Sequence, residues 1–299
     1  MMQRNVGKDP QLQIRMMITI FLLGLLYAGF ILTLWSLGAG IFFIVILAVV
    51  MVGIQFTFSG RMVLLSMHAK LVSAKEEPGL YKMVERLAFA AGVPKPRIAV
   101  SQMTIPNAFA TGRSTKSAVV AVTQGLKDLL NDREMEAVLA HEISHIKHRD
   151  MIVMTYASFF AVVASTLMSL FFWMGLFGGF SRRGRGGGGN AIIIAYVVTI
   201  LVWLLSQLLL ATLSRYREFS ADRAAAQLTG RPADLISALT RINGTIHEVP
   251  KDDLRKAASM NAFFILPAMG GGISGLFSTH PKVTKRIERL QTMEANLGL

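Results

Sequence analysis

The sequence predicts a mostly helical α+β protein, in which four apolar helical segments form a membrane anchor of two hairpins and a globular part carries a small β-sheet. Two observations favour this fold class. Of the 299 residues, 53% are hydrophobic and the mean hydropathy is +0.49, which is too apolar for a wholly soluble protein. The charged residues are also confined to part of the chain, because residues 16–60, 152–181 and 190–214 contain none.

The first hairpin is expected from residues 16–34 and 41–58, each about long enough to cross a hydrocarbon core of roughly 30 Å. Basic residues precede the first segment and follow the second, so the positive-inside rule places both ends in the cytoplasm. A cleaved signal peptide is the competing interpretation, but its removal would leave a second long apolar span at the new terminus. Residues 1–60 are therefore interpreted as an N-terminal tail and a transmembrane hairpin.

The second hairpin is expected within residues 151–214, from the apolar segments 151–180 and 191–213. The linker 181–190 reads SRRGRGGGGN, and its three arginines violate the positive-inside rule if both segments cross the membrane. Two arrangements stay open. Either the pair spans the membrane with these arginines at the far headgroups, or it enters the membrane without fully crossing.

Residues 61–150 are expected to form the first part of the globular domain. The pattern predicts an amphipathic helix over 78–91 and short β-branched strands over 97–103 and 117–123. The segment between the strands, 106–116, is rich in turn-forming residues.

The helix that follows carries the most informative motif. Asn131 is the predicted cap, Glu134 the capping-box acid, and the helix is expected to run to about residue 148. Inside it, residues 141–145 read HEISH, an H-E-x-x-H motif. Histidines at i and i+4 lie on one helix face, so both can bind one tetrahedral zinc, while Glu142 can accept a proton from the attacking water.

A third ligand must come from elsewhere in the chain. His148 shares the helix face, but a rise of about 10 Å over seven residues separates it from His141. Residues 215–299 form the second part of the globular domain, and its first helix has Glu218 and Asp222 one turn apart. Glu218 would supply a carboxylate, and Asp222 would accept a hydrogen bond from the free nitrogen of a ligating histidine. The second apolar hairpin begins and ends beside these two helices and would bring them together.

Four helices are predicted in this second part. The first, over about 215–229, is expected to stop at Gly230, because glycine readily adopts the left-handed conformation of a helix C-terminus. The others are expected near residues 233–242, 252–260 and 281–295.

Composition excludes several classes of protein and partner. The absence of cysteine excludes a disulfide scaffold, a catalytic thiol and a thiolate metal site. The net charge of +13 is explained by the positive-inside bias and by attraction to anionic lipid. No nucleic-acid-binding motif accompanies the charge, so a lipid bilayer, and not nucleic acid, is the expected partner.

Together the motifs resemble those of the HtpX-type membrane heat-shock endopeptidases of bacteria, which are zincins related to the eukaryotic prenyl-protein endopeptidases. The resemblance rests on HEISH at 141–145, EFSAD at 218–222, NAFATG at 107–112, and His280-Pro281 followed by Arg286. With the paired apolar hairpins, it covers essentially the whole chain.

The resemblance implies a zincin-like metalloprotease domain that faces the cytoplasm from the bacterial inner membrane. It implies one Zn²⁺ per chain, bound by His141, His145 and Glu218, with Glu142 as the general base and acid. The implied substrates are unfolded or misfolded proteins, mainly membrane proteins, which such enzymes hydrolyse in quality control and the stress response.

The resemblance also implies supporting residues around the metal. His280 would stabilise the oxyanion of the tetrahedral intermediate, with Arg286 as support, and Asp222 would lie behind a ligand. Asn107 and Ala108 would lie on or beside an edge strand that pairs with the backbone of the substrate.

Three other classes of protein share part of this pattern. An intramembrane zinc protease is disfavoured, because the helix over 132–150 has charged residues near both ends and belongs at the membrane surface. A membrane scaffold or transporter subunit with a degenerate zinc site stays open, although the spans contain no charge for an ion pathway. A prenyl-protein-processing protease would share the zinc site and also stays open.

Overall fold

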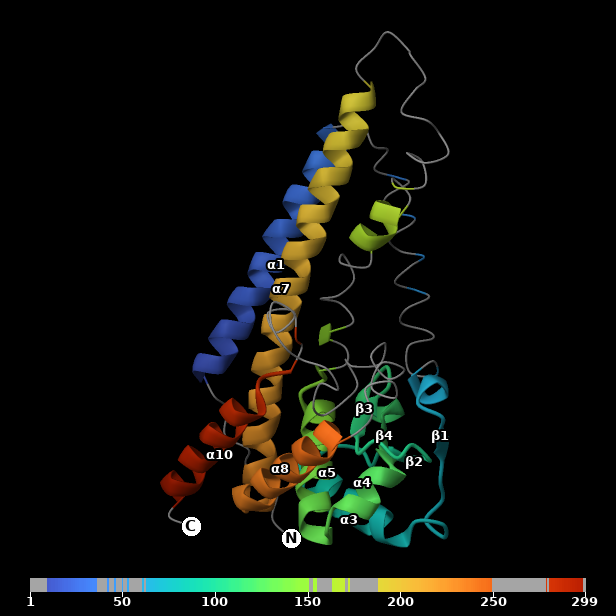
Figure 1. The fold of residues 1–299 in the computed structure, drawn as a ribbon, viewed down its shortest axis with the longest axis vertical. Helices are drawn as coiled ribbons and strands as arrows, with labels where there is room; N and C mark the ends of the chain where they lie inside the picture. The colour runs from blue at the N-terminus through green and yellow to red at the C-terminus, as the bar shows by residue number, and fades with distance from the viewer. Residues whose placement is uncertain are drawn as a thin grey trace.

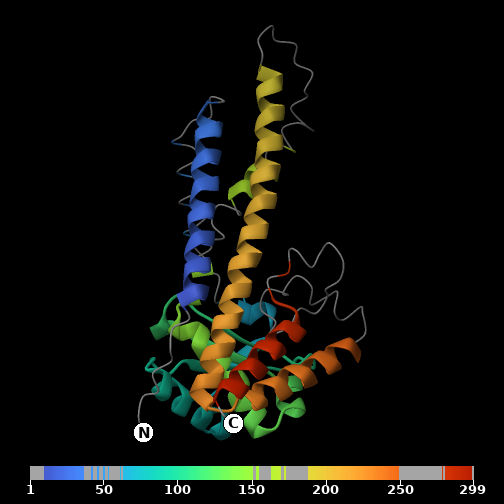
Figure 2. The same cartoon turned by 90° about the vertical axis from the view of Figure 1, so that its left-hand side faces the viewer.

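The computed structural model describes residues 10–36, 63–150, 188–248 and 280–297, together with isolated residues and short pieces between them. Two long helices lie next to each other and extend away from a domain of short helices and a small sheet (Figures 1 and 2). The predicted mostly helical α+β class is confirmed.

The two long helices are α1 (Pro10–Ser36) and α7 (Gly188–Thr229), and they pack along each other. Their contact is apolar and includes Leu23, Tyr27 and Val202. By length and composition alone, both helices could cross a membrane. They contain two of the four predicted apolar segments.

The other two predicted apolar segments, residues 41–58 and 151–180, lie largely outside the described residues. The four-segment anchor therefore stays a prediction. The helix predicted near residues 252–260 also lies outside the described part of the chain.

The helix α7 differs from the prediction in one respect. A separate helix was expected to begin near Arg215, but α7 continues without a break through Ser214 and Arg215 to Thr229. Its 42 residues span about 63 Å at 1.5 Å per residue. The change from an apolar to a charged sequence therefore marks a change of surroundings and not the end of a helix.

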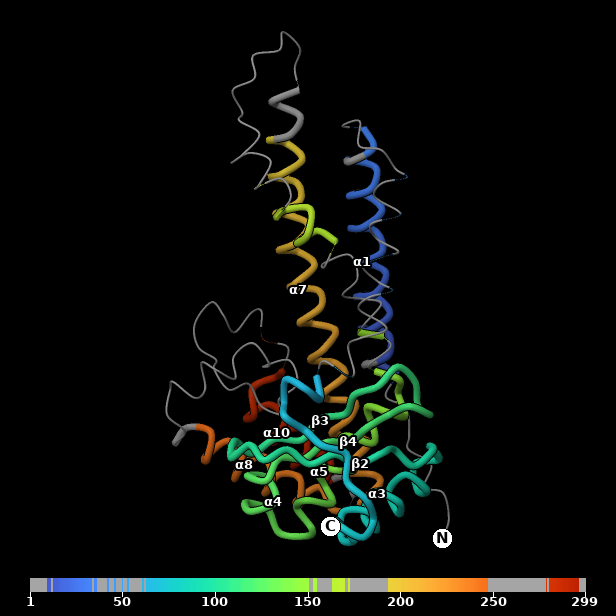
Figure 3. Tube along the Cα trace, turned by 90° about the vertical axis from the view of Figure 1, so that its right-hand side faces the viewer, coloured from blue at the N-terminus to red at the C-terminus, as the bar shows by residue number. Residues whose placement is uncertain are grey.

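A four-stranded mixed sheet lies in the globular part of the molecule, at the opposite end from the tips of α1 and α7 (Figure 3). Its spatial order is β1-β2-β4-β3, with β2 and β4 parallel and the outer pairs antiparallel. The strands are β1 (Ala69–Leu71), β2 (Arg97–Ser101), β3 (Ala108–Thr111) and β4 (Val119–Thr123). All five residues of β4 are buried, as expected of an apolar strand inside a sheet.

The strands predicted over 97–103 and 117–123 are confirmed as β2 and β4, whereas β3 lies inside the segment predicted as turns. Its four small or aromatic residues, AFAT, show no polar alternation, and pairing with β4 makes them a strand. Thr123 holds the start of β3 in place. Its hydroxyl donates to the Ile105 carbonyl at 2.8 Å and accepts from the Asn107 N–H at 2.8 Å.

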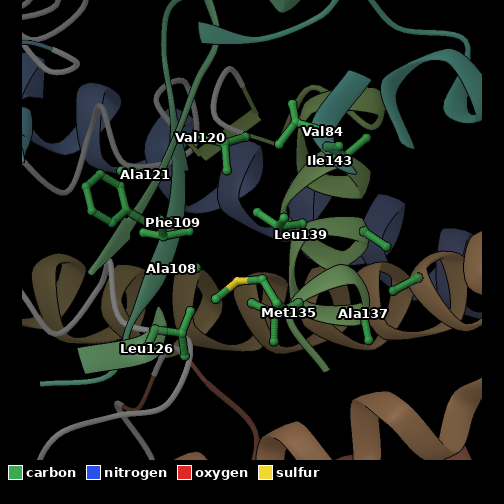
Figure 4. Close-up of a cluster of buried hydrophobic side chains, with 14 of the residues drawn as sticks. Val84, Ala108, Phe109, Val120, Ala121, Leu126, Met135, Ala137, Leu139 and Ile143 are labelled. Carbon is green, nitrogen blue, oxygen red and sulfur yellow. The ribbon is translucent and has the colours of Figure 1, made fainter. Parts of the chain in front are cut away.

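The helices α3 (Pro78–Ala91) and α5 (Asp132–Lys147) pack against each other, and α5 also contacts the sheet. The bounds of α3 match those predicted, with Gly92 in the left-handed conformation at its C-terminus. In Figure 4, Met135 and Leu139 of α5 lie beside the strands that carry Phe109 and Val120. This apolar contact fixes α5 next to the edge strand β3.

The predicted N-terminus of α5 is also confirmed. Asn131 Oδ1 accepts hydrogen bonds from the N–H groups of Arg133 and Glu134, both at 3.0 Å. The Glu134 carboxylate in turn accepts a hydrogen bond from the Asn131 N–H. Glu134 is 4% exposed and also accepts from Ser237 at 2.6 Å and from Arg241 at 2.7 Å. Both partners belong to α8 (Pro232–Glu248), so one carboxylate caps α5 and connects it to α8.

We expect Glu134→Ala to destabilise the domain by about 2 kcal/mol, because it removes a cap and breaks the hydrogen bonds that the buried carboxylate accepts from Ser237 and Arg241 of α8. The unfolding midpoint in detergent should fall by roughly 5 °C or more. Glu85→Ala is the control, since Glu85 is exposed and paired with Lys95 at the surface. It should cost less than about 1 kcal/mol. Equal shifts for the two variants would contradict the proposed connection.

The last described helix, α10 (Val283–Leu297), packs on α8 and α7. The helices predicted near 233–242 and 281–295 thus correspond to α8 and α10. Gly230 ends α7 as expected, with φ at 70°. The packing of α10 on α7 brings the segment from His280 to Arg286 to the motif helix α5.

Candidate metal centre

The H-E-x-x-H motif lies in the C-terminal half of α5, on the side that faces α7. His141 is 1% exposed and its Nε2 lies 3.1 Å from Nε2 of His145. The spacing of i and i+4 predicted this convergence, and the capping at Asn131 sets the register of the helix that produces it.

Glu218 of α7 completes a cluster of three. Its Oε2 lies 3.5 Å from His141 Nε2, and its Oε1 lies 3.4 Å from His145 Nε2. Ligand atoms about 2.0–2.1 Å from a tetrahedral zinc would lie about 3.4 Å from one another. Among the described residues, Glu218 Oε2 is buried and makes no hydrogen bond, so it keeps an electron pair for a metal. The donor set and its geometry therefore fit a metal ion.

Glu142 is 4% exposed and neighbours His141 on α5. It does not belong to the cluster of ligand atoms. This leaves its carboxylate available for a role other than metal binding.

Asp222 and Arg286 lie directly behind His141. Asp222 Oδ1 is 3.0 Å from His141 Nδ1, the ring nitrogen that points away from the cluster. Arg286 is fully buried and donates to both oxygens of Asp222, from Nε at 2.8 Å and from Nη2 at 2.6 Å. Its third nitrogen, Nη1, lies 3.4 Å from Glu218 Oε2. Arg286 thus contacts two carboxylates of the site.

His280 lies at the cluster with its Nδ1 3.4 Å from Glu218 Oε2. It is 8% exposed, and neither ring nitrogen makes a hydrogen bond within the part of the chain that the structure describes. Its segment is anchored through Ser278, since Arg215 donates to the Ser278 carbonyl and the Ser278 hydroxyl donates to the His280 carbonyl. The imidazole is held at the site with its donor and acceptor atoms available.

Asn107 and Ala108 lie at the start of β3, which is an edge of the described sheet. Asn107 pairs with Thr123 of β4 through its N–H and C=O groups. Antiparallel strands alternate hydrogen-bonded and open pairs, so Ala108 and Ala110 direct their backbone groups away from β4. Both side chains at the start of the strand are buried. This edge of the described sheet therefore offers the backbone N–H and C=O groups of Ala108 and Ala110 for pairing.

Sequence reasoning missed two buried residues at the site, Asp150 and Arg217. Asp150 Oδ2 lies 2.6 Å from His145 Nδ1, and its Oδ1 lies 3.0 Å from Arg217 Nε. A spacing of five residues from His145 does not match a helix face. Arg149 adopts a left-handed conformation, φ 56°, which ends the helix and turns Asp150 back. An acid just past the end of the motif helix was the available signal.

The electrostatics of the site stabilise positive charge. Burial lowers the pKa of His145, but Asp150 and Glu218 outweigh it and raise this pKa to about 10. Burial would raise the pKa of Asp150, yet Arg217 and His145 hold it at about 2. Ionised carboxylates around two imidazoles form a site in which a metal cation can replace protons.

An H-E-x-x-H helix beside a small mixed sheet, with a glutamate contributed by a second helix, defines a metallopeptidase. The sequence profile of Peptidase family M48 matches residues 74–294, and the chain belongs to that family. The predicted class of enzyme, a metalloprotease, is confirmed. The family match and the two apolar helices identify the chain as a membrane metalloprotease.

Curated relatives match the full length of the chain. "Protease HtpX homolog" of Moorella thermoacetica is 49% identical over 99% of both chains. "Protease HtpX homolog 2" of Methanosarcina mazei is 48% identical over 99% of this chain and 100% of its own. The resemblance stated from the motifs is thereby confirmed.

A similar fold occurs in the crystal structure of S. mikatae Ste24p. The TM-score is 0.55 at 21% identity, over 94% of this chain and 67% of the other. At this identity the comparison supports the fold alone.

Proposed function

We propose that this chain is a zinc-dependent endopeptidase with one Zn²⁺, held by His141, His145 and Glu218. The observation that carries the proposal is the convergence of three side chains from two helices: the two Nε2 atoms lie 3.1 Å apart, and each lies 3.4–3.5 Å from one oxygen of Glu218. When bound, zinc would polarise the scissile carbonyl and lower the pKa of a coordinated water toward 7.

The residues of the chain divide the remaining work. Glu142 accepts the proton of the attacking water and returns it to the leaving amine. His280 donates a hydrogen bond to the developing oxyanion, and this role is supported by its ring nitrogens, which make no hydrogen bond to any residue that the structure describes. Asp222 holds the Nδ1 proton of His141, so that Nε2 presents its lone pair to the metal, and Arg286 compensates the buried charge of Asp222.

The substrate backbone is proposed to add to the open edge of β3, beside the motif helix. Because this pairing uses the N–H and C=O groups of Ala108 and Ala110, it depends little on the sequence of the substrate. Asn107 orients the strand through its pairing with β4. This mode of binding suits unfolded or misfolded segments.

We expect Ala110→Pro to raise KM and to lower kcat/KM by about 3- to 10-fold, because it removes one outward backbone donor worth about 0.5–1.5 kcal/mol. Proline is tolerated on an edge strand where its nitrogen faces away from the neighbouring strand. Ala110→Val keeps the donor and serves as the control in the same peptide hydrolysis assay. Wild-type kinetics for folded Ala110→Pro would count against substrate pairing at this edge.

The proposed location is the bacterial cytoplasmic membrane, with a multi-pass anchor of four apolar segments, of which the second pair is spanning or re-entrant, and with the metal centre on the cytoplasmic side. In this arrangement residues 1–60 and 151–214 provide the two apolar hairpins, and residues 61–150 and 215–299 form the catalytic domain. The charge-free stretches and the placement of basic residues support it. A site next to the membrane suits misfolded membrane proteins as substrates in quality control and the stress response.

Hydrolysis of unfolded casein by the full chain, purified in detergent, tests the proposed function. Cleavage should stop when a chelator removes zinc and return when zinc, but not magnesium, is added. Cleavage by metal-free protein would contradict the mechanism. A zinc-loaded, folded protein that cleaves no unfolded protein would favour the scaffold interpretation.

A further inference from the structure

The metal centre contains the same three-part arrangement twice. In the first, His141 Nδ1 faces Asp222, which Arg286 pairs through both of its oxygens. In the second, His145 Nδ1 faces Asp150, which Arg217 pairs from its other side. Each cluster histidine therefore has its own carboxylate, and each carboxylate has its own guanidinium.

The second arrangement is built from a different part of the chain. Asp150 follows the end of α5, immediately before the second apolar segment, and Arg217 lies on α7 next to Glu218. Asp150 is 2% exposed and Arg217 is 7% exposed. The pair thus joins the end of the helix that carries both histidines to the helix that carries the third ligand.

The contacts have a direct chemical consequence for His145. A carboxylate 2.6 Å from Nδ1 holds the ring proton on that nitrogen, which leaves the lone pair of Nε2 directed at His141 and Glu218. It also fixes the plane of the ring and increases the basicity of Nε2. A buried carboxylate without a partner would be costly, and Arg217 removes this cost by pairing with Oδ1.

We propose that Asp150 and Arg217 are positioning residues of the metal centre, which hold His145 in the tautomer and orientation that bind a divalent cation. This inference rests on the zinc site proposed above. It assigns to the pair a role that a purely structural bridge between α5 and α7 would not have, namely control of metal affinity.

The test measures the zinc dissociation constant of the full chain in detergent, by competition with a chromophoric chelator, and does not rely on activity. Asp150→Asn keeps the size of the side chain but removes its charge. We expect it to weaken zinc binding by about 10- to 100-fold, as is usual for a group behind a ligating histidine. Arg217→Met should weaken binding in the same direction, and the double variant should be less affected than the product of the two single effects.

Glu136→Gln is the matched control. Glu136 also lies on α5 and pairs with two arginines, at 2.7 and 2.8 Å, but it contacts neither histidine. Its loss should leave zinc affinity within about twofold of wild type, because a positioning effect requires contact with a ligand. If loss of any ion pair on α5 weakened zinc binding equally, the pair would be a structural bridge and the inference would be wrong.

Arg217→Lys is a conservative variant that is expected to fold, because it keeps the positive charge and loses only the Nε donor. Cobalt(II), bound in place of zinc, reports the coordination geometry through its visible spectrum. An altered spectrum in a protein with a wild-type unfolding midpoint supports positioning. An unchanged spectrum and zinc affinity in folded Arg217→Lys and Asp150→Asn would overturn it. Failure of the wild-type chain itself to bind zinc would instead overturn the proposed function.

Discussion

Glu142→Gln should abolish peptide hydrolysis while zinc remains bound with wild-type affinity. The carboxylate is buried beside His141 but lies outside the group of ligand atoms. In the proposed mechanism its removal takes away the acceptor for the proton of water and leaves the proposed metal ligands intact. General base catalysis contributes about 10²–10⁴-fold, so kcat should fall by about 10³-fold.

The measurement combines casein hydrolysis with the zinc content of the purified protein. Glu136→Gln, five residues before the motif on the same helix, is the control and should retain activity. Zinc lost from Glu142→Gln would mean that Glu142 is a ligand, and substantial residual turnover would mean that another group accepts the proton.

Glu218→Gln should remove zinc from the site and thereby remove activity. Its two carboxylate oxygens lie 3.5 and 3.4 Å from the Nε2 atoms of the two histidines, and it supplies the negative charge among the three candidate ligands. The loss in affinity should exceed the 10- to 100-fold expected of a group that acts from behind a ligand. Excess zinc should restore part of the activity.

The two glutamine variants together distinguish a general base from a metal ligand. One should retain zinc without turnover, and the other should recover some turnover when zinc is added. Metal content measured by atomic emission, before and after addition of zinc, distinguishes them. Full zinc occupancy in Glu218→Gln would remove Glu218 from the set of ligands.

The motif helix and the convergence of its two histidines could be predicted because the relevant information is local. The capping box at Asn131 and Glu134 sets where α5 begins, and the i and i+4 spacing sets where its histidines point. Glu218 could be found because the charge-free stretch before it implied a hairpin that returns to the same place. Placement of these residues required only helix periodicity and chain topology.

Other features could not be predicted because they depend on contacts between distant residues. The strand β3 is extended through its pairing with β4 and its anchoring by Thr123, and its four residues alone have no distinctive pattern. Asp150 reaches His145 through one left-handed residue, which periodicity does not anticipate. The uninterrupted α7 was missed because a change in polarity resembles the boundary of a helix.

The continuity of α7 determines how far the proposed catalytic site lies from the membrane surface. In the proposed topology the apolar part of this helix ends near Leu213, and Glu218 lies about 7 Å further along the axis at 1.5 Å per residue. Because one unbroken helix carries both the apolar segment and Glu218, it sets the distance between the proposed metal site and the lipid. A polypeptide leaving the bilayer would need to extend by only two or three residues, at about 3.3 Å each, to bring a peptide bond to this level. If membrane proteins are the substrates, as proposed, cleavage is expected close to the lipid surface, at the distance that α7 sets between the membrane and Glu218.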